Sequence, residues 1–260
     1  MKQRLQVPAL VSKYWLPLAL LVLWWYASSG SQSLYFPPLS EICRVAWRDL
    51  TSGPLVGYLG FSLTNLVFGL AIAITTGVVF GVLLGSLPRV LSAVDPYIQF
   101  MRSIPQVALV PLIIGALGIG AVPKIWSIGF ACMWPILLST IDGVRGVDPS
   151  QIDFARAYRL PKIARYLDVI VPAAMPQIIP GVRIALAIGV IVMVVSELYG
   201  ADSGIGYYIL QSGRNFAVRE TWAGTILVGL IGYALSRLFE VFEHIALRWY
   251  FESSAQSQRG

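Results

Sequence analysis

The sequence predicts an all-α integral membrane protein with about six transmembrane helices. Two features of its composition support this fold class. The 260 residues are 57% hydrophobic and only 12% charged, with a mean hydropathy of +0.71, whereas a soluble domain carries about 25% charged residues. Apolar runs of roughly 20 residues recur, and such runs can cross a hydrocarbon core about 30 Å thick. One membrane domain therefore accounts for nearly all of the chain.

Six apolar segments are the expected spans, and they cover residues 14–28, 58–85, 106–121, 124–142, 180–200 and 221–247. Lys and Arg are retained preferentially on the cytoplasmic side of membrane proteins. With the N-terminus inside, only five of the 19 basic residues fall on the outer side: Arg44, Arg48, Lys124, Arg214 and Arg219. Both termini are therefore predicted to be cytoplasmic. The net charge of +6 has the same explanation, and nucleic acid is not an expected partner.

Residues 1–57 are expected to form an N-terminal transmembrane helix and an external loop. Basic residues precede an apolar core at 16–26, as in a signal peptide, and Ala27 to Ser29 could mimic a cleavage site. An uncleaved anchor helix is the preferred interpretation. In the external loop, residues 39–50 are expected to form an amphipathic segment on the outer surface.

Small residues recur at every fourth position of the second expected span. A step of four places them on one stripe of a helix, where the missing side chains allow a second helix to approach closely. Glycine is also common in membrane helices in general, but five small residues in register favour tight packing. The expected helix-packing residues are Gly69, Ala73, Gly77, Gly81 and Gly85.

A polar stretch, residues 148–172, separates the fourth and fifth spans, and we call it the elbow. Asp148 and Pro149 are typical of a helix start, because a carboxylate can accept hydrogen bonds from free backbone N–H groups and proline suits the first turn. Pro161 disfavours helical geometry at Leu160 and predicts a break. A second short helix is expected from Lys162 to about residue 169, ending before Pro172.

The elbow resembles the signature loop of permease subunits of bacterial ATP-binding-cassette importers. That loop reads Glu-Ala-Ala, three residues, Gly, nine residues, then Ile-x-Leu-Pro. Here residues 153–155 stand at the first element, Arg159 at the glycine and residues 169–172 at the end. With arginine at the glycine position, Leu160-Pro161 is expected to supply the turn. Further motifs resemble the nitrate, sulfonate and taurine branch of these permeases; they lie at 102–112, 118–120, 143–145, 172–176, 181–186 and 203–207.

The resemblance covers about residues 58–249 and implies the architecture of a type I importer permease. Residues 58–249 would form its transmembrane domain, the elbow would contain the coupling helix that sits in a cleft of the ATPase, and residues 250–260 would be a cytoplasmic tail. Expected partners are a dimer of cytoplasmic ATPases, a second permease copy or homologue, and an extracytoplasmic solute-binding protein. The expected location is the bacterial plasma (inner) membrane. By resemblance, the ATPase-coupling residues are Asp153, Ala155, Arg156, Tyr158, Arg159 and Lys162.

The chain lacks the usual means of binding ATP phosphates. A P-loop needs Gly-Lys followed by Ser or Thr, and the four lysines follow Met1, Ser12, Pro123 and Pro161. The sequence offers no nucleophile–base pair, no metal-ligand cluster and no cofactor motif, so we expect a transport subunit without catalytic residues. ATP would be bound by the partner subunit.

Polar residues within the expected spans are candidates for a transport pathway or gate: Asn65, Ser139 and Glu197. The resemblance implies that Gly204 and Gly206, in the turn after the fifth span, belong to the same gate. A charge at the bilayer centre costs on the order of 3 kcal/mol, so a carboxylate there usually has a partner or lines a pathway. Alternatively, Glu197 lies at the end of its span and simply reaches the headgroup region. An autonomous ion-coupled transporter or channel remains the alternative function, although the spans offer few ionisable residues; a lipid-modifying enzyme is disfavoured.

Overall fold

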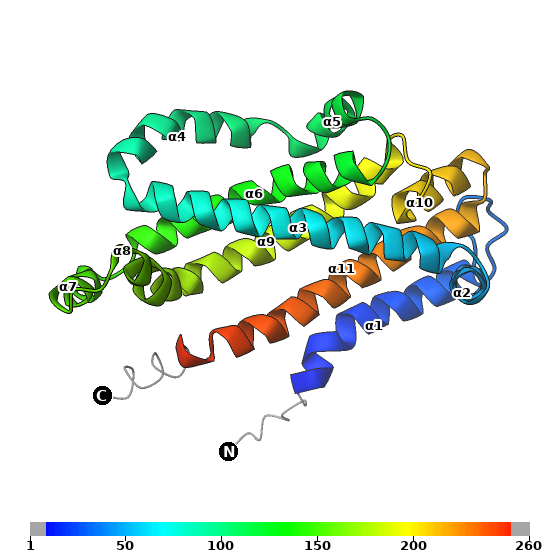
Figure 1. Cartoon of the computed structure of the whole chain (residues 1–260). Helices are drawn as coiled ribbons and strands as arrows, with labels where there is room; N and C mark the ends of the chain where they lie inside the picture. The colour runs from blue at the N-terminus through cyan, green and yellow to red at the C-terminus, as the bar shows by residue number, and fades with distance from the viewer. Residues whose placement is uncertain (1–8, 251–260) are drawn as a thin grey trace, which may run out of the picture. The chain divides into compact units, whose positions relative to one another are not determined.

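The structure is a computed structural model that describes residues 9–250, with side chains from residue 15 onward (Figure 1). Every regular element in this range is helical. The elements are α1 (Ala9–Ser28), α2 (Leu39–Thr51), α3 (Leu55–Ser86), α4 (Pro88–Ser103), η1 (Gln106–Leu109), α5 (Val110–Leu117), α6 (Ala121–Arg145), α7 (Pro149–Ala157), α8 (Lys162–Ala164), the π-helical η2 (Arg165–Ile170), α9 (Val171–Leu198), α10 (Ile205–Arg214) and α11 (Val218–Ala246).

The chain divides into two compact units, which we describe separately. Among the described residues, unit 1 contains residues 9–56 and Tyr208–Leu227, and unit 2 contains Gly57–Tyr207 and residues 228–250. In unit 1 the apolar side of α2 forms the core. Leu39, Ile42 and Val45 of this helix pack with Ala223 of α11, so the amphipathic segment expected near residues 39–50 is a helix.

The all-helical membrane fold is confirmed, and the spans differ in number and position from those expected. Four helices are long and apolar enough to cross a membrane: α3, α6, the run Lys162–Leu198 and α11. A fifth is reached if α4 and the residues from Gln106 to Leu117 are counted as one span bent by 82°. In the first expected span, the part with described side chains, Trp15–Ser28, is a shorter apolar helix.

The third expected span, residues 106–121, is wrong as a span complete in itself, because its helical part, Gln106–Leu117, forms a bent pair with α4. The structure instead has α4 before it, then a break at Ile104, the short turn η1, and α5. Ile104 is extended (φ −75°, ψ 126°) because Pro105 disfavours helical geometry in the residue before it. The helix α4 was missed because it is amphipathic rather than uniformly apolar; its Leu91 and Ile98 pack on α6.

The fifth expected span begins far earlier than residue 180. An unbroken helical run of 37 residues extends from Lys162 to Leu198, and Pro172, Pro176 and Pro180 do not interrupt it. The π-helical turn of η2 lies immediately before Pro172. Such a turn changes the backbone hydrogen-bond pattern, and proline is tolerated in membrane helices because nearby groups satisfy the freed carbonyls. The part of the elbow from Lys162 onward is therefore continuous with the fifth span.

In unit 2, α6 packs against both α3 and α9 (Figure 1). A methyl group added to Gly69, Gly77 or Gly85 would collide with Ile128, Ile136 or Val144 of α6, respectively. The residue numbers rise together along both helices, so α3 and α6 run parallel. The small-residue stripe, in which Ala73 is fully buried, is thus the α6-facing side of α3. By the same test α6 and α9 are antiparallel, with Gly143 beside Ala174 and Gly181 beside Ser139.

Candidate functional sites: the elbow and the Glu197 network

The first helix of the elbow, α7, starts where the sequence predicts. The Asp148 carboxylate accepts a hydrogen bond from the backbone N–H of Ser150 (2.8 Å), and Pro149 occupies the first turn. The bond from the Ser150 N–H holds the pKa of Asp148 below its usual range, so this cap stays ionised. Along α7, Asp153 and Arg156 form an exposed ion pair of 3.2 Å. Pairs of this kind add only a few tenths of a kcal/mol, so they do not explain why the helix is ordered.

The helix α7 ends in a Schellman motif centred on Arg159. The N–H of Leu160 donates to the carbonyl of Ala155 (3.1 Å), and the N–H of Arg159 donates to the carbonyl of Arg156 (2.9 Å). The motif requires a left-handed residue, and Arg159 has φ of +53°. This conformation costs a residue with a Cβ roughly 1–2 kcal/mol. The turn is therefore made at Arg159 itself, and Pro161 serves as the cap of the following helix.

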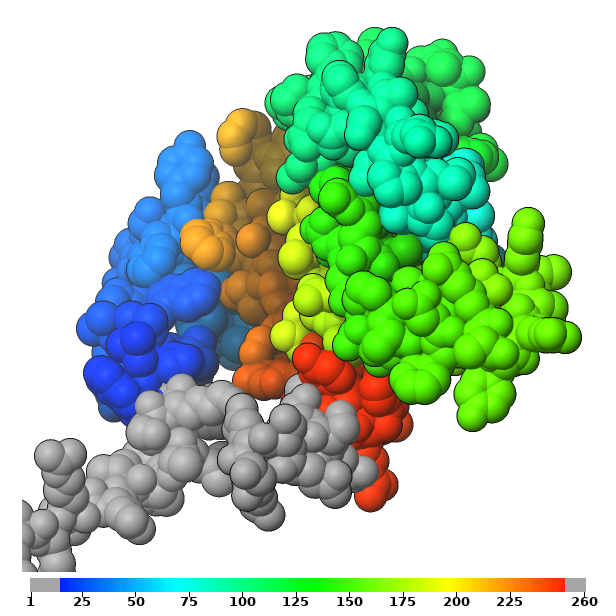
Figure 2. Space-filling view, turned by 90° about the vertical axis from the view of Figure 1, so that its left-hand side faces the viewer, coloured from blue at the N-terminus to red at the C-terminus, as the bar shows by residue number. Residues whose placement is uncertain are grey.

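The outer surface of the elbow combines aromatic, aliphatic and basic side chains. Tyr158 is 80% exposed and Phe154 is 66% exposed, and Ile163 and Leu167 are similarly open. The basic residues Arg156, Arg159 and Lys162 are also exposed. In Figure 2 the residues of α7 and of the turn after it, in green to yellow-green, stand out from the surface. Large exposed apolar side chains grouped on a protein surface usually mark an interaction site.

One expected coupling residue, Ala155, does not face outward. It is 4% exposed, and it lines a groove of about 740 Å³ behind α7 together with Tyr158, Asp168 and Trp249. The base of the elbow is held by an apolar cluster in which Ile170 packs with Val144, Val147, Ala174 and Ile178. Ala155 thus contributes to the support of α7, whereas the other five expected coupling residues are at the surface.

A second site is the buried network around Glu197 at the end of α9. Its Oε2 accepts hydrogen bonds from the Ser62 hydroxyl and from the backbone N–H of Gly206, both at 2.9 Å. The Ser62 oxygen in turn accepts one from the N–H of Ile205 (2.9 Å). Glu197 is 1% exposed, so it is buried within the protein. The carboxylate therefore ties the start of α10 to α3.

Two glycines make this network possible. Gly204 has φ of +114°, and a methyl group placed on it would collide with the Glu197 carboxylate. A methyl group on Gly206 would collide with the carbonyl of Val194. The structure therefore brings together three of the expected gate residues, Glu197, Gly204 and Gly206. Ser62, which the sequence analysis missed, is the partner that connects them to α3.

The other two expected gate residues lie apart from the hydrogen bonds of the Glu197 network. Asn65 is buried one turn after Ser62 on α3, and its amide nitrogen has no hydrogen-bond partner among the described residues. Ser139 lies at the contact between α6 and α9, where a methyl group on Gly181 would approach its Cβ to 2.5 Å. Lys124 is also buried; its Nζ donates to the carbonyl of Gly120 (2.7 Å) and lies over the Phe61 ring.

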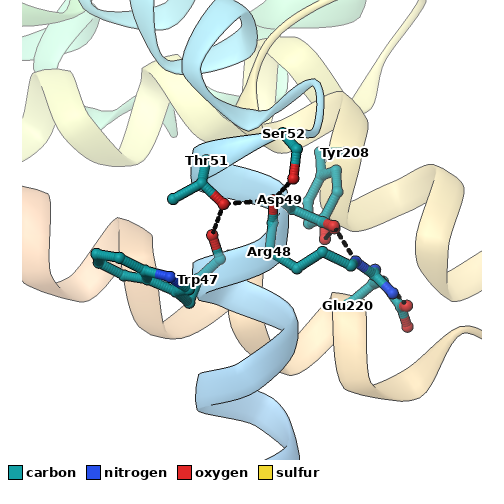
Figure 3. A network of polar contacts seen from close by, with 7 residues as sticks. All are labelled: Trp47, Arg48, Asp49, Thr51, Ser52, Tyr208 and Glu220. Carbon is teal, nitrogen blue, oxygen red and sulfur yellow. Dashed lines mark hydrogen bonds and ion pairs between the residues drawn. The ribbon is translucent and has the colours of Figure 1, made fainter.

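Unit 1 contains a separate polar network, shown in Figure 3. The Asp49 carboxylate accepts hydrogen bonds from Arg48 Nε and from the Tyr208 hydroxyl, each at 2.7 Å, and Arg48 also pairs with Glu220 (3.3 Å). Burial raises the pKa of Asp49, but the bonds from Arg48 and Tyr208 outweigh it and hold that pKa below its usual range. Burial and the bond to Asp49 raise the pKa of Tyr208. The network joins α2 to α10 and to the start of α11.

The helical spans and the exposed elbow define a multi-pass membrane transport subunit, and comparison with known proteins identifies its family. Residues 73–248 match the family model described as the binding-protein-dependent transport system inner membrane component. The chain belongs to this family. It is accordingly an inner-membrane permease rather than an enzyme, and in such systems ATP is handled by a partner subunit.

Similar proteins cover nearly the full length of the chain. It is 30% identical over 236 residues to the putative aliphatic sulfonates transport permease SsuC of Bacillus subtilis, covering 90% of this chain and 86% of that protein. It is 28% identical over 240 residues to the taurine transport permease TauC of Escherichia coli, covering 90% and 87%. The chain is thus similar to permeases named for aliphatic sulfonates and for taurine, in agreement with the branch that the sequence motifs resemble.

A solved structure shares the fold. A chain from inward-facing conformations of the MetNI methionine ABC transporter aligns with a TM-score of 0.58 and 18% identity, covering 80% of this chain and 97% of that one. At this level of identity the likeness establishes the fold alone. The permease fold inferred from the sequence is thereby confirmed.

Proposed function

We propose that this permease carries a small solute, a nitrate-, sulfonate- or taurine-like anion or a related organic compound, across the bacterial inner membrane by ATP-driven alternating access. The names of the two relatives support this substrate class. An extracytoplasmic binding protein delivers the solute, two cytoplasmic ATPases drive the cycle, and a second copy or close homologue completes the pathway. Both termini and the elbow face the cytoplasm, since 14 of the 19 basic residues fall on that side in this orientation.

The observation that carries the proposal is the exposed, well-ordered elbow. Its helix is capped at Asp148, ended by a Schellman motif and supported from below by an apolar cluster. A solvated linker has no need of these three devices. The surface they support combines Tyr and Arg side chains, which are enriched at protein interfaces. The elbow therefore has the character of a docking surface for the ATPase.

The Glu197 network is the proposed extracytoplasmic gate. Its hydrogen bonds with Ser62 and Gly206 hold the start of α10 against α3. Breaking these hydrogen bonds would free the start of α10 to move. The Glu197 network lies at the end of α9 that is opposite the elbow. Asn65 and Ser139 are proposed to act at the helix contacts beside the pathway rather than in the Glu197 network itself.

Charge reversal at Arg156 tests the docking of the elbow. The test uses the permease in complex with its ATPase and binding protein. Arg156→Glu is expected to lower ATP-dependent uptake of labelled taurine by at least about tenfold, or to release the ATPase during purification. The reason is that the variant reverses a charge at the docking surface. Arg89→Glu is the matched control, since Arg89 is an exposed arginine of α4 outside the elbow. Normal uptake by Arg156→Glu in an intact complex would contradict the assignment. Uptake by the permease alone in vesicles would instead favour an ion-coupled transporter.

A further inference from the structure

Arg159 is held in the most strained backbone conformation of the elbow. Of the described residues, only Arg159 and Phe216 adopt positive φ without being glycine. We propose that Arg159 selects the ATPase partner: its guanidinium pairs with a carboxylate on the surface of the ATPase and excludes ATPases that lack an acidic residue there. The inference rests on the proposed docking of the elbow and adds the identity of one contact and its chemistry.

The backbone of this turn has no need of an arginine. The Schellman motif uses only the N–H and C=O groups of residues 155–160, and glycine satisfies the same geometry without the Cβ clash. An arginine here makes the isolated permease less stable than a glycine would. Backbone strain of this kind persists where a side chain has a function that depends on its position.

The guanidinium of Arg159 is available for a partner. Among residues 15–250 it forms no ion pair or side-chain hydrogen bond, whereas the neighbouring Arg156 is paired with Asp153. Arg159 is exposed and follows the aromatic ring of Tyr158, which is 80% exposed. Guanidinium groups bind carboxylates through two parallel hydrogen bonds. Tyr and Arg side chains together are also the usual centre of a protein–protein contact.

A lipid phosphate is the competing anion, and the length of the adjoining helix argues against it. The run Lys162–Leu198 has 37 residues, which corresponds to about 55 Å at 1.5 Å per residue. The hydrocarbon core is about 30 Å thick, or about 40–45 Å with the headgroups. If Leu198 lies at the outer boundary of the core and the helix is nearly upright, Lys162, three residues after Arg159, reaches about 15–20 Å beyond the inner headgroups. A soluble protein is therefore the partner within reach of Arg159.

The test uses the full-length permease and its ATPase subunit, with Arg159→Gly and Arg159→Lys as the variants. Arg159→Gly is expected to leave the isolated permease at least as stable to heat, yet to weaken ATPase binding by about tenfold or more. Arg159→Lys keeps the charge but loses the two-bonded geometry, so its affinity should lie between the two. Phe216→Gly is the matched control, because it relaxes the same strain at a turn without a cation and should leave ATPase affinity unchanged.

Salt dependence separates an ion pair from a change in shape. Affinity of the wild-type permease for the ATPase should fall between about 50 and 300 mM salt, and that of Arg159→Gly should fall less. Unchanged affinity and salt dependence in Arg159→Gly would overturn the proposal. So would a loss of binding only to anionic lipid vesicles, which would identify lipid phosphate as the ligand. If Arg159→Gly binds normally while Arg156→Glu does not, the elbow docks without this contact; if both bind normally, the docking itself is wrong.

Discussion

Replacing Gly81 by alanine tests the contact between α3 and α6. The added methyl carbon would lie 2.5 Å from Cβ and 2.7 Å from Cγ2 of Thr140, and 3.0 Å from the carbonyl oxygen of Leu137. Carbon atoms in good contact are about 3.5–4.0 Å apart, so the two helices would have to separate by about 1 Å. Overpacking of a well-packed interior costs about 1–3 kcal/mol.

Gly60 provides the matched control in the same helix. A methyl group at Gly60 has nothing within 4 Å, so Gly60→Ala changes only the intrinsic preference of the backbone for a helix. That preference, worth up to about 1 kcal/mol, is shared by both variants and cancels in the comparison. The free energy of unfolding of Gly81→Ala should therefore be about 1–3 kcal/mol lower than that of Gly60→Ala.

Reversible unfolding in mixed micelles with increasing SDS, followed by tryptophan fluorescence, measures both free energies. A second readout is the inserted amount of each variant in the membrane, which should fall for Gly81→Ala only. Equal unfolding free energies for the two variants would refute the reasoning, since they would mean that α3 and α6 are not in contact at Gly81.

Two further predictions concern the polar networks. Gly204→Ala should weaken uptake by the assembled transporter, because its methyl group displaces the buried Glu197 carboxylate. Gly229→Ala is the control and should not weaken uptake, because the added methyl group has open space around it. Equal uptake by both variants would show that Gly204 is not part of the gate. Tyr208→Phe removes a donor to Asp49 and should lower the unfolding free energy by about 1.5 kcal/mol at neutral pH. The folded pKa of Asp49 is depressed, so this contribution is complete above the usual carboxylate pKa and is lost as the pH falls through the lower folded value. The difference between Tyr208→Phe and the wild type should therefore shrink in acid, and a constant difference would contradict this account.

The sequence predicts the membrane class and the long spans because their apolar runs are unambiguous. It misses α4, whose polar and apolar residues alternate along an amphipathic helix and carry no hydropathy signal. It also places a break at Pro172, since the π-helical turn that accommodates this proline has no recognisable sequence pattern. These two errors account for the misplaced third and fifth spans.

Of the site features, those that depend on local sequence could be predicted, and those that depend on long-range contacts could not. The start of α7 follows from Asp148 and Pro149, whose chemistry is local. The partnership of Glu197 with Ser62 joins positions far apart in the chain, and no local signal indicates it. Asn65, one turn after Ser62, was a hint that this face of α3 is polar. At Arg159, the loss of glycine suggested that the turn moves to Leu160-Pro161, whereas the backbone keeps its left-handed geometry at Arg159.

The helical run from Lys162 to Leu198 connects the elbow to the Glu197 network. Its N-terminal end lies within the elbow, and its C-terminal end carries Glu197. Over a length of about 55 Å, a tilt of about 5° displaces the far end by roughly 5 Å. That distance exceeds the reach of a hydrogen bond. If the elbow is the docking site and the Glu197 network is the gate, as proposed, a tilt of this run about its elbow end would by itself separate Glu197 from Ser62.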